Sequence, residues 1–481
     1  MPQPPRMATG PRSAAGGGDQ PPVFDPACLA RATIEVLAAQ ADSPAALARR
    51  QQSRLQSVVA AARAGSALYR ERLRGVVPGR TPLADWPTVG KAELMARFDH
   101  WVTDPALRLA ELQAFTADPR RIGQRYAGRY QVWESSGSSG VPAIFVHDAW
   151  AMAVYDALET LRRPARPAWQ RWTDPMGLAE CMVFVGAIDG HFASQVQMLR
   201  LGRINPWLAG RLHSVSILQP TAALVAQLQA LAPTVVATYP SVALLLADEA
   251  AAGRLPTRPR ELWTGGETLS AGEAHRLHQL LGCSVSNSYG ASEFLPLGWQ
   301  CAHGRLHANT DWALLEPVDE QMRPVPAGQR SHTTLLTHLA QTVQPLIRYD
   351  LGDRLTVAAE QCGCGSVLPV IEVQGRCDER LRMAGTDGRI VTLLPLALTS
   401  VLEDDAGLFD FELRQRDRHT MELRLPLAGT DGAAALARGC AALQAFAVQQ
   451  GVDRPRVVGA CGCIPTRGRS GKAQRISALP D

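Results

Sequence analysis

The spacing of apolar residues changes near residue 180 and gives the chain two differently patterned parts. Residues 26–74 have helical spacing, with Ala, Leu and Val on one face and Arg and Gln on the other. From about 180 onward, short apolar runs alternate with stretches of helix length. This alternation predicts strands at 182–188, 215–218, 234–239, 261–264 and 283–288, with helices at 221–231, 241–252 and 271–281.

Strands separated by helices favour right-handed crossovers and a mainly parallel, buried sheet, so we expect an α/β fold. A boundary is expected near residue 375, where a strand-like run at 368–373 ends and a shorter α+β region follows. Residues 1–24 are rich in Pro, Gly, Ala and Gln without an apolar core, which is typical of a disordered tail. The expected organisation is therefore a tail at 1–24, a large domain at 25–375 and a small domain at 376–481.

Composition excludes several functional classes. The chain is 46% apolar and 20% charged with a net charge of +4, an ordinary globular balance. No block of like charge recurs, so we expect no nucleic-acid partner, and no apolar stretch has the length of a membrane span. Ten cysteines in 481 residues are too few for a disulfide scaffold, which favours a reducing, cytoplasmic location. Only two of the 49 Lys and Arg residues are lysine, Lys91 and Lys472.

Gly-rich or polar segments follow several predicted strands. Residues 238–241, 265–267 and 289–293 all fall where strands finish. Any one of them is also explained as an ordinary turn. In open α/β sheets, however, the ligand crevice lies outside the carboxyl ends of the strands, so together these segments indicate one cleft.

The run Ser-Ser-Gly-Ser-Ser-Gly-Val-Pro at 135–142 lies between strand-like residues 130–133 and 143–146. A flexible linker is one interpretation. A Gly-rich hairpin between strands can instead turn backbone N–H groups and hydroxyls towards a phosphate. It is not a P-loop, because no Lys-Ser or Lys-Thr follows the second glycine.

The chain resembles the adenylate-forming superfamily of acyl-CoA synthetases, peptide-synthetase adenylation domains and luciferases. The resemblance rests on motifs that occur in the superfamily's order: the phosphate loop at 135–142, Tyr-Gly-x-Thr-Glu at 289–293, Tyr-x-x-Gly-Asp at 349–353, the hinge at 375–385 and the catalytic motif at 471–475. These motifs extend over nearly the whole chain, and they imply a large multi-layer domain followed by a mobile C-terminal domain.

The resemblance implies a site for ATP and Mg²⁺. The loop would hold the β- and γ-phosphates, Tyr289 would stack on adenine, Asp353 would accept both ribose hydroxyls, and Glu293 would bind Mg²⁺. A surface ion pair is the alternative for Asp353 and Arg376. The residues assigned to ATP or AMP are Ser135, Ser136, Gly137, Ser138, Ser139, Gly140, Gly265, Gly266, Glu267, Ser288, Tyr289, Gly290, Ala291, Ser292, Asp353 and Arg376.

The resemblance also assigns catalysis to Lys472, and an ammonium beside the α-phosphate would stabilise the charge that builds as pyrophosphate leaves. Arginine substitutes poorly for such a point charge on a slim stem. Lys91, near the start of a predicted N-terminal helix, is interpreted as structural. Asp378 matches the hinge about which the small domain rotates between adenylation and thioester formation.

A second cluster has the ligands of a closed metal site. Cys301 with His307, and Cys362 with Cys364, supply thiolates and an imidazole, which favours a structural Zn²⁺. His303 is the rival to His307, and unrelated buried thiols with surface histidines are the alternative. The pattern resembles the phenylacetate–coenzyme A ligase-like branch. Cys461-Gly-Cys463 has no evident partner histidine and is interpreted as structural.

The acid pocket is expected beside the strand exits, with His191, Phe192, Tyr239 and Ser241 as candidates, or as residues that pack the sheet ends. Rings, a histidine and hydroxyls suit an aryl acid. Residues 190–194 and 301–307 resemble members of that branch in aryl-polyene or xanthomonadin-type pigment pathways. The resemblance implies that the acid is a hydroxybenzoate and that it would be loaded onto an acyl carrier protein. An aryl-CoA ligase using coenzyme A and a non-catalytic nucleotide-binding homologue remain alternatives. Two departures are Val141, where the loop commonly has lysine, and Arg382 in the hinge motif.

Overall fold

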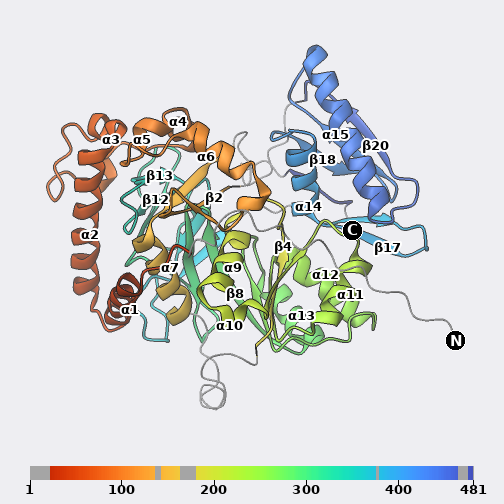
Figure 1. The fold of residues 1–481 in the computed structure, drawn as a ribbon, viewed down its shortest axis with the longest axis horizontal. Coiled ribbons are helices and arrows are strands. Elements are labelled where there is room, and N and C mark those ends of the chain that lie inside the picture. The colour runs from red at the N-terminus through yellow and green to blue at the C-terminus, as the bar shows by residue number, and fades with distance from the viewer. Residues whose placement is uncertain (1–21, 136–141, 163–179, 375–378, 464–474, 480–481) are drawn as a thin grey trace.

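The computed structural model describes residues 22–135, 142–162, 180–374, 379–463 and 475–479 (Figure 1). The helices are α1 (Pro26–Gln40), α2 (Pro44–Gly65), α3 (Ala67–Arg72), η1 (Leu83–Asp85), α4 (Lys91–Ala96), α5 (Phe98–Trp101), α6 (Leu109–Thr116), η2 (Pro119–Arg121), α7 (Ala149–Arg162), α9 (Ala193–Ile204), α10 (Pro206–Ala209), α11 (Thr221–Leu231), α12 (Pro240–Ala251), α13 (Ala271–Leu281), α14 (Pro395–Ser400), η3 (Val401–Asp405) and α15 (Gly429–Gln449).

The strands follow the same order along the chain. They are β1 (Arg125–Tyr126), β2 (Tyr130–Glu134), β3 (Ile144–His147), β4 (Met182–Gly186), β5 (Leu212–Ser216), β6 (Val235–Thr238), β7 (Glu261–Thr264), β8 (Ser284–Ala291), β9 (Phe294–Gln300), β10 (Leu306–Ala308), β11 (Ala313–Val318), β12 (Thr333–His338), β13 (Tyr349–Asp350), β14 (Arg354–Val357), β15 (Ile371–Gln374), β16 (Leu381–Ala384), β17 (Ile390–Leu393), β18 (Glu412–Gln415), β19 (Thr420–Arg424), β20 (Arg456–Ala460) and β21 (Ile476–Ser477).

The N-terminal helical segment is divided by its own capping residues. The side chains of Asp25, Ser43 and Ser66 each accept backbone N–H groups at the start of α1, α2 and α3. The predicted helical stretch at 26–74 is therefore three helices. Val23, which the sequence analysis placed in the tail, is buried, and its carbonyl accepts a hydrogen bond from Arg200 Nε at 2.9 Å.

A seven-stranded sheet forms the centre of the large domain, in the order β10-β9-β8-β7-β6-β4-β5. Its β5-β4-β6-β7-β8 part is entirely parallel, which confirms the predicted mainly parallel α/β fold. The helices α11 and α13 begin and end at the predicted residues. The antiparallel additions β9 and β10 were not predicted.

Smaller antiparallel sheets flank this sheet. β1-β2-β3 and β11-β12-β13 lie towards the N-terminal helices, and the helix α9 packs between β2 and the strands β4 and β5. At the C-terminal end, the strands β20-β19-β18-β21 form a separate sheet covered by α15 (Figure 1, blue). The small domain is thus α+β, as expected.

Two apolar clusters hold these layers together. One joins the N-terminal helices to the antiparallel sheets, and the other runs from the parallel strands and α12 into the small domain. A bidentate ion pair lies inside the large domain, where Arg162 contacts both carboxylate oxygens of Asp311 at 2.7 Å. Their side chains are only 2% and 0% exposed.

Among the described residues, none of the helices combines the length and apolar character that a bilayer crossing requires.

Removing one partner of the Arg162–Asp311 pair would leave an uncompensated charge in the interior. We expect Asp311→Ala to lower the free energy of unfolding by about 3–5 kcal/mol, measured by urea unfolding followed with tryptophan fluorescence. The matched control is Asp387→Ala, because Asp387 is 51% exposed in its ion pair with Arg389. Equal midpoints for the two variants would contradict the assignment.

Candidate active site

A large cleft lies where the strand order of the parallel sheet reverses. Strand β4 pairs with both β5 and β6. The chain passes from β4 to β5 on one side of the sheet, and from β6 to β7 on the other side. This is a topological switch point, at which open α/β sheets bind ligands outside the carboxyl ends of their strands. The cleft has a volume of about 3360 Å³ and is lined by residues of both domains.

The expected phosphate loop joins two paired strands. β2 and β3 are paired antiparallel, and Ser135 and Ala143 continue this pairing beyond the strand ends. The Ser135 N–H donates to Ala143 O at 2.8 Å, and Ser135 Oγ accepts from Ala143 N at 3.0 Å. Ser135 itself lines the cleft. Ser136, Gly137, Ser138, Ser139 and Gly140 lie outside the described residues.

The turn after β7 is built for close approach. A Cβ at Gly265 would lie 2.8 Å from Ser288 Oγ, and Gly266 has φ +80° with the Tyr239 ring only 3.1 Å from the Cβ position. Glu267 then reaches the start of α12, where it accepts from Ser241 N at 2.8 Å and Ser241 Oγ at 2.9 Å. A carboxylate at a helix N-terminus is stabilised by the helix dipole.

The tip of the β8–β9 hairpin carries the most constrained backbone of the site. A Cβ at Gly290 would lie 2.1 Å from Leu295 O, so only glycine fits between the strands here. The pairing register shifts between Tyr289 and Ala291. The tip is tied to the β2–β3 hairpin, because Trp133 Nε1 donates to Ser292 O at 2.8 Å.

Two tyrosine hydroxyls are paired with carboxylates at this tip. Tyr289 donates to Asp353 Oδ2 at 2.9 Å, and Tyr349 donates to Glu293 Oε1 at 2.8 Å. Burial raises the pKa of Glu293, and the Tyr349 hydroxyl and the charge of Lys91 oppose that rise. All four residues line the cleft. Carboxylate oxygens are ligands that a hard cation such as Mg²⁺ prefers.

Lys91 is a cleft residue that the sequence analysis interpreted as structural. It begins α4, lines the cleft, and is close enough to Glu293 for its charge to act on that carboxyl group. No local motif marks it. The only signal in the sequence is that lysine is so scarce.

Three of the four residues expected in the acid pocket lie along the cleft. Phe192, Tyr239 and Ser241 line the cleft, and Phe184, which was not predicted, adds a ring 6.2 Å from that of Tyr239. His191 is a correction. Its side chain is 1% exposed and its ring packs 5.3 Å from the buried Phe115, so it lies in the interior rather than along the described cleft.

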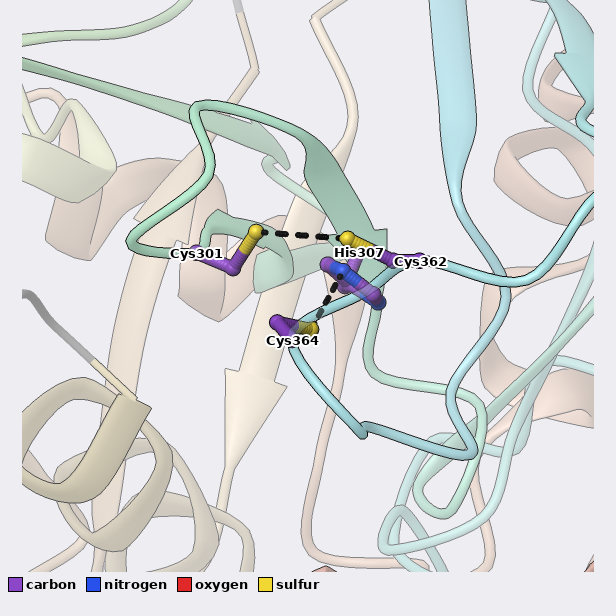
Figure 2. A group of neighbouring side chains, drawn as sticks. All are labelled: Cys301, His307, Cys362 and Cys364. Carbon is purple, nitrogen blue, oxygen red and sulfur yellow. Dashed lines mark hydrogen bonds between the residues drawn. The ribbon is translucent and has the colours of Figure 1, made fainter.

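The expected metal ligands lie together on three segments (Figure 2). One ligand atom from each of Cys301, His307, Cys362 and Cys364 falls within 4.8 Å of the others. The Cys301 and Cys362 sulfur atoms are 3.8 Å apart, too far for a disulfide, and Cys364 Sγ is 3.4 Å from His307 Nε2. His303 is exposed and outside this group.

The separations within the cluster suit a tetrahedral ion. Two sulfurs that bind one zinc at about 2.3 Å lie about 3.8 Å apart. His307 Nδ1 is 2.8 Å from Leu368 O, so the Nδ1–H donates to this carbonyl and Nε2 keeps its lone pair for a metal. The ligands would tie the β9–β10 turn to the loop before β15.

Three assigned residues, Arg376, Asp378 and the catalytic candidate Lys472, lie outside the described residues. The chain resumes at Arg475, whose Nη2 contacts Glu403 Oε1 at 2.7 Å in a buried ion pair. The Arg475 guanidinium also stacks 4.1 Å from the centre of the Phe411 ring. These contacts fix the point at which the segment expected to carry Lys472 rejoins the small domain.

Comparisons with known proteins agree with this geometry. A family model described as AMP-binding enzyme matches residues 204–331, which carry the strand exits and the β8–β9 tip. A structure of 2-hydroxyisobutyryl-CoA ligase in the thioesterification state is 21% identical, covers 91% of each chain and has a TM-score of 0.57. The fold is that of the adenylate-forming enzymes.

The same ligase in its postadenylation state is also similar to this adenylate-forming fold, with 22% identity and a TM-score of 0.51. That match covers 90% of this chain and 89% of the ligase. No curated protein matches the sequence.

A methyl group at position 290 would force β8 and β9 apart and displace Tyr289 and Glu293. Since a shift of about 1 Å can cost about 100-fold in rate, we expect Gly290→Ala to lose turnover on this scale and to bind ATP more weakly, as measured by calorimetry. Gly272→Ala is the control, because its Cβ would meet nothing within 4 Å. Unchanged ATP binding by Gly290→Ala would contradict the proposed constraint.

Proposed function

We propose that this protein activates a carboxylic acid with ATP to form an acyl adenylate and then transfers the acyl group to a thiol. The observation that carries the proposal is the paired arrangement of Tyr289–Asp353 and Tyr349–Glu293 beside the phosphate hairpin. These residues line one cleft, where Tyr289 would offer a flat ring to the adenine, Asp353 a carboxylate to the ribose and Glu293 a ligand to Mg²⁺. The match of residues 204–331 to AMP-binding enzymes supports the same reaction.

The chemistry proposed for these residues is mainly binding and charge stabilisation. Glu293 would hold Mg²⁺, and the cation would lower the negative charge that the attacking carboxylate meets. The carboxylate oxygen attacks the α-phosphorus, and pyrophosphate leaves with the bonding electrons. Lys472 would stabilise this transition state, while Asp353 and Tyr289 hold the nucleoside.

An aryl acid is the proposed substrate class, and a hydroxybenzoate the specific candidate. Phe184, Phe192 and Tyr239 supply rings at the switch point, and the Ser241 hydroxyl supplies a polar group nearby. A mostly apolar pocket with few polar groups orients a flat acid with its carboxylate towards the cleft.

The proposed acceptor is the phosphopantetheine thiol of an acyl carrier protein, on the resemblance to hydroxybenzoate-loading enzymes. Coenzyme A is the second candidate, because the structurally similar 2-hydroxyisobutyryl-CoA ligase was solved with coenzyme A and its acyl adenylate. Both acceptors present the same thiol arm, so the first half-reaction is common to them.

The test is pyrophosphate release over benzoic, hydroxybenzoic, phenylacetic and fatty acids, followed by transfer to coenzyme A or to a phosphopantetheinylated carrier. We expect release with an aryl acid, and a loss of at least about 100-fold in Lys472→Ala with an unchanged thermal midpoint. No release with any acid would overturn the proposal in favour of a non-catalytic nucleotide-binding protein.

We also propose a structural zinc ion at Cys301, His307, Cys362 and Cys364. Four protein ligands leave no open coordination position, so the ion would stabilise rather than react. It would join the β10 edge of the large sheet to the loop that connects β14 to β15.

Metal analysis of the purified protein tests the zinc proposal. We expect one zinc per chain in the wild type, and a loss of most of it with a fall in thermal midpoint of about 5 °C or more in Cys364→Ser. Cys463→Ser is the control, since Cys463 is outside the cluster. Substoichiometric zinc in the wild type, or full zinc in Cys364→Ser, would remove the assignment.

A further inference from the structure

One face of the parallel sheet is open to the cleft. On β4, Val183 and Val185 belong to an apolar core cluster, whereas Phe184 between them lines the cleft. The same division holds on β6, where Val236 belongs to the core and Ala237 lines the cleft. Because side chains alternate between the two faces of a strand, the cleft extends over one face of the sheet as well as beyond the strand ends.

Three neighbouring strands place a small residue between two aromatic residues on this face. Phe184 of β4 is in register with Ala237 of β6, and Ala237 is in register with Trp263 of β7. Neighbouring strands lie about 4.8 Å apart, so the backbones of Phe184 and Trp263 are about 10 Å apart. Aromatic rings in contact have centroids about 4.5–7 Å apart, so a ring between two others needs about 9–14 Å. The spacing therefore suits one further ring above Ala237.

The burial of Ala237 indicates that this space is open. Strand β6 lies between β4 and β7 inside the sheet, and Val236 and Thr238 on either side of Ala237 are buried. Ala237 itself is half-buried. Val235, on the same face of β6, is 0% exposed, which closes the space towards the amino end of the strand. The side chains of the described residues thus leave a pocket above Ala237.

A third aromatic residue forms the wall at the carboxyl end. Tyr239 follows Ala237 by two residues and has an extended backbone, with φ −85° and ψ 150°, so its side chain lies on the same face. Its ring centre is 6.2 Å from that of Phe184, with an angle of 70° between the ring planes. The Ala237 pocket thus has Ala237 as its floor and Phe184, Tyr239 and Trp263 as its walls, and all four residues line the cleft.

Gly186 makes room for the Phe184 ring in this wall. The two residues lie on the same face of β4, and a Cβ at Gly186 would be 2.2 Å from Phe184 Cζ. Gly186 does not have a positive φ, so the backbone conformation does not require glycine here. Any larger residue would displace the ring, and with it one wall of the pocket.

The walls are aromatic and carry no formal charge. Trp263 Nε1 donates to Glu261 Oε2 at 3.1 Å, so the polar group of the indole is bonded within its own strand. Rings of this kind bind another ring through stacked or edge-to-face contacts. The pocket lies beside the switch-point strand β4 and opens into the cleft, so an acid that binds by its ring keeps its carboxylate in the cleft.

We propose that the Ala237 pocket binds the aromatic ring of the acid substrate, that it admits one such ring, and that Ala237 and Gly186 determine this selectivity. The proposal rests on the proposed function above and deepens it, since it names residues that select the acid. The pocket takes part in no bond-breaking step. It binds the ring and thereby orients the carboxylate for attack on the α-phosphorus.

Ala237→Leu tests the floor, because the larger side chain would fill the space between Phe184 and Trp263. Calorimetry with benzoic and hydroxybenzoic acids should give affinities at least about tenfold weaker than in the wild type, since one methylene in a hydrophobic pocket is worth about 10–200-fold. The affinities for ATP and AMP should stay unchanged. The ratio of pyrophosphate exchange with hydroxybenzoic acid to exchange with propionic acid should fall by a similar factor.

Gly186→Ala tests the wall, and it should weaken the binding of both aryl acids through the displaced Phe184 ring. In Gly186→Ala/Phe184→Leu the clashing ring atom is absent, so part of the affinity should return. A role of Gly186 in strand stability alone would not be rescued in this way. Gly210→Ala is the matched control, because a Cβ there would meet nothing within 4 Å and its φ is −76°. It should leave acid binding unchanged.

Unchanged acid affinity in Ala237→Leu would overturn the proposal. An equal loss of AMP affinity would also overturn it, because the pocket would then hold the adenine. A wild type that binds neither aryl acid would overturn it as well. A wild type that binds the acids but releases no pyrophosphate would reject the proposed function, while a selective loss of acid affinity in Ala237→Leu would still support the pocket.

Discussion

The close approach of Gly290 to the Leu295 carbonyl is the constraint on which the site depends. At this point the sheet changes from the parallel β8 to the antiparallel β9, and the register shift turns the strand ends into the cleft. Tyr289 then meets Asp353, while Glu293 meets Tyr349. Any residue with a Cβ at position 290 would separate these pairs. One glycine therefore sets the geometry of both tyrosine–carboxylate pairs.

Burial gives these pairs their electrostatic character. Glu293 is a half-buried carboxylate at the cleft whose raised pKa reflects its lost hydration, and Asp353 adds a like charge nearby. Buried carboxylates of this kind are stable when cations or donors meet them. The tyrosine hydroxyls satisfy one oxygen each, which leaves the site suited to a bound cation. The charge of Lys91 and the proposed Mg²⁺ would both stabilise the ionised form of Glu293.

The sequence predicts the parallel half of the fold well because its signals are local. The helix α13 begins where the Ser270–Glu273 capping box starts it, and β7 matches its predicted bounds. The antiparallel strands β9 and β10 were missed, since their pairing depends on a bulge and on contacts with distant segments. Val23 was misplaced for the same reason: its burial comes from Arg200 and the core, which no local pattern contains.

The candidate site shows the same difference between local signals and contacts between distant segments. Short motifs singled out Tyr289, Glu293 and Asp353, which the structure brings to one cleft, and cysteine spacing singled out four residues that lie together. Their roles stay predictions. His191 was misplaced, since an aromatic, Gly-rich stretch does not indicate which side chains face the interior. Phe184 was not predicted as a cleft residue, because an aromatic residue within a buried strand is usually interpreted as part of the core.

Lys91 is the instructive case, because its place depends on a contact between segments some 260 residues apart in the chain, Val89 and Tyr349. Local sequence makes it the first residue of a short helix and nothing more. Composition carries the remaining information: a chain that uses arginine for all but two of its Lys and Arg positions has lysine at a position that lines the same cleft as Glu293. A planar guanidinium serves paired or stacked contacts, as Arg348 and Arg475 do here, whereas the compact ammonium of lysine acts as a point charge. The scarcity of lysine is therefore informative only once the fold places the residue.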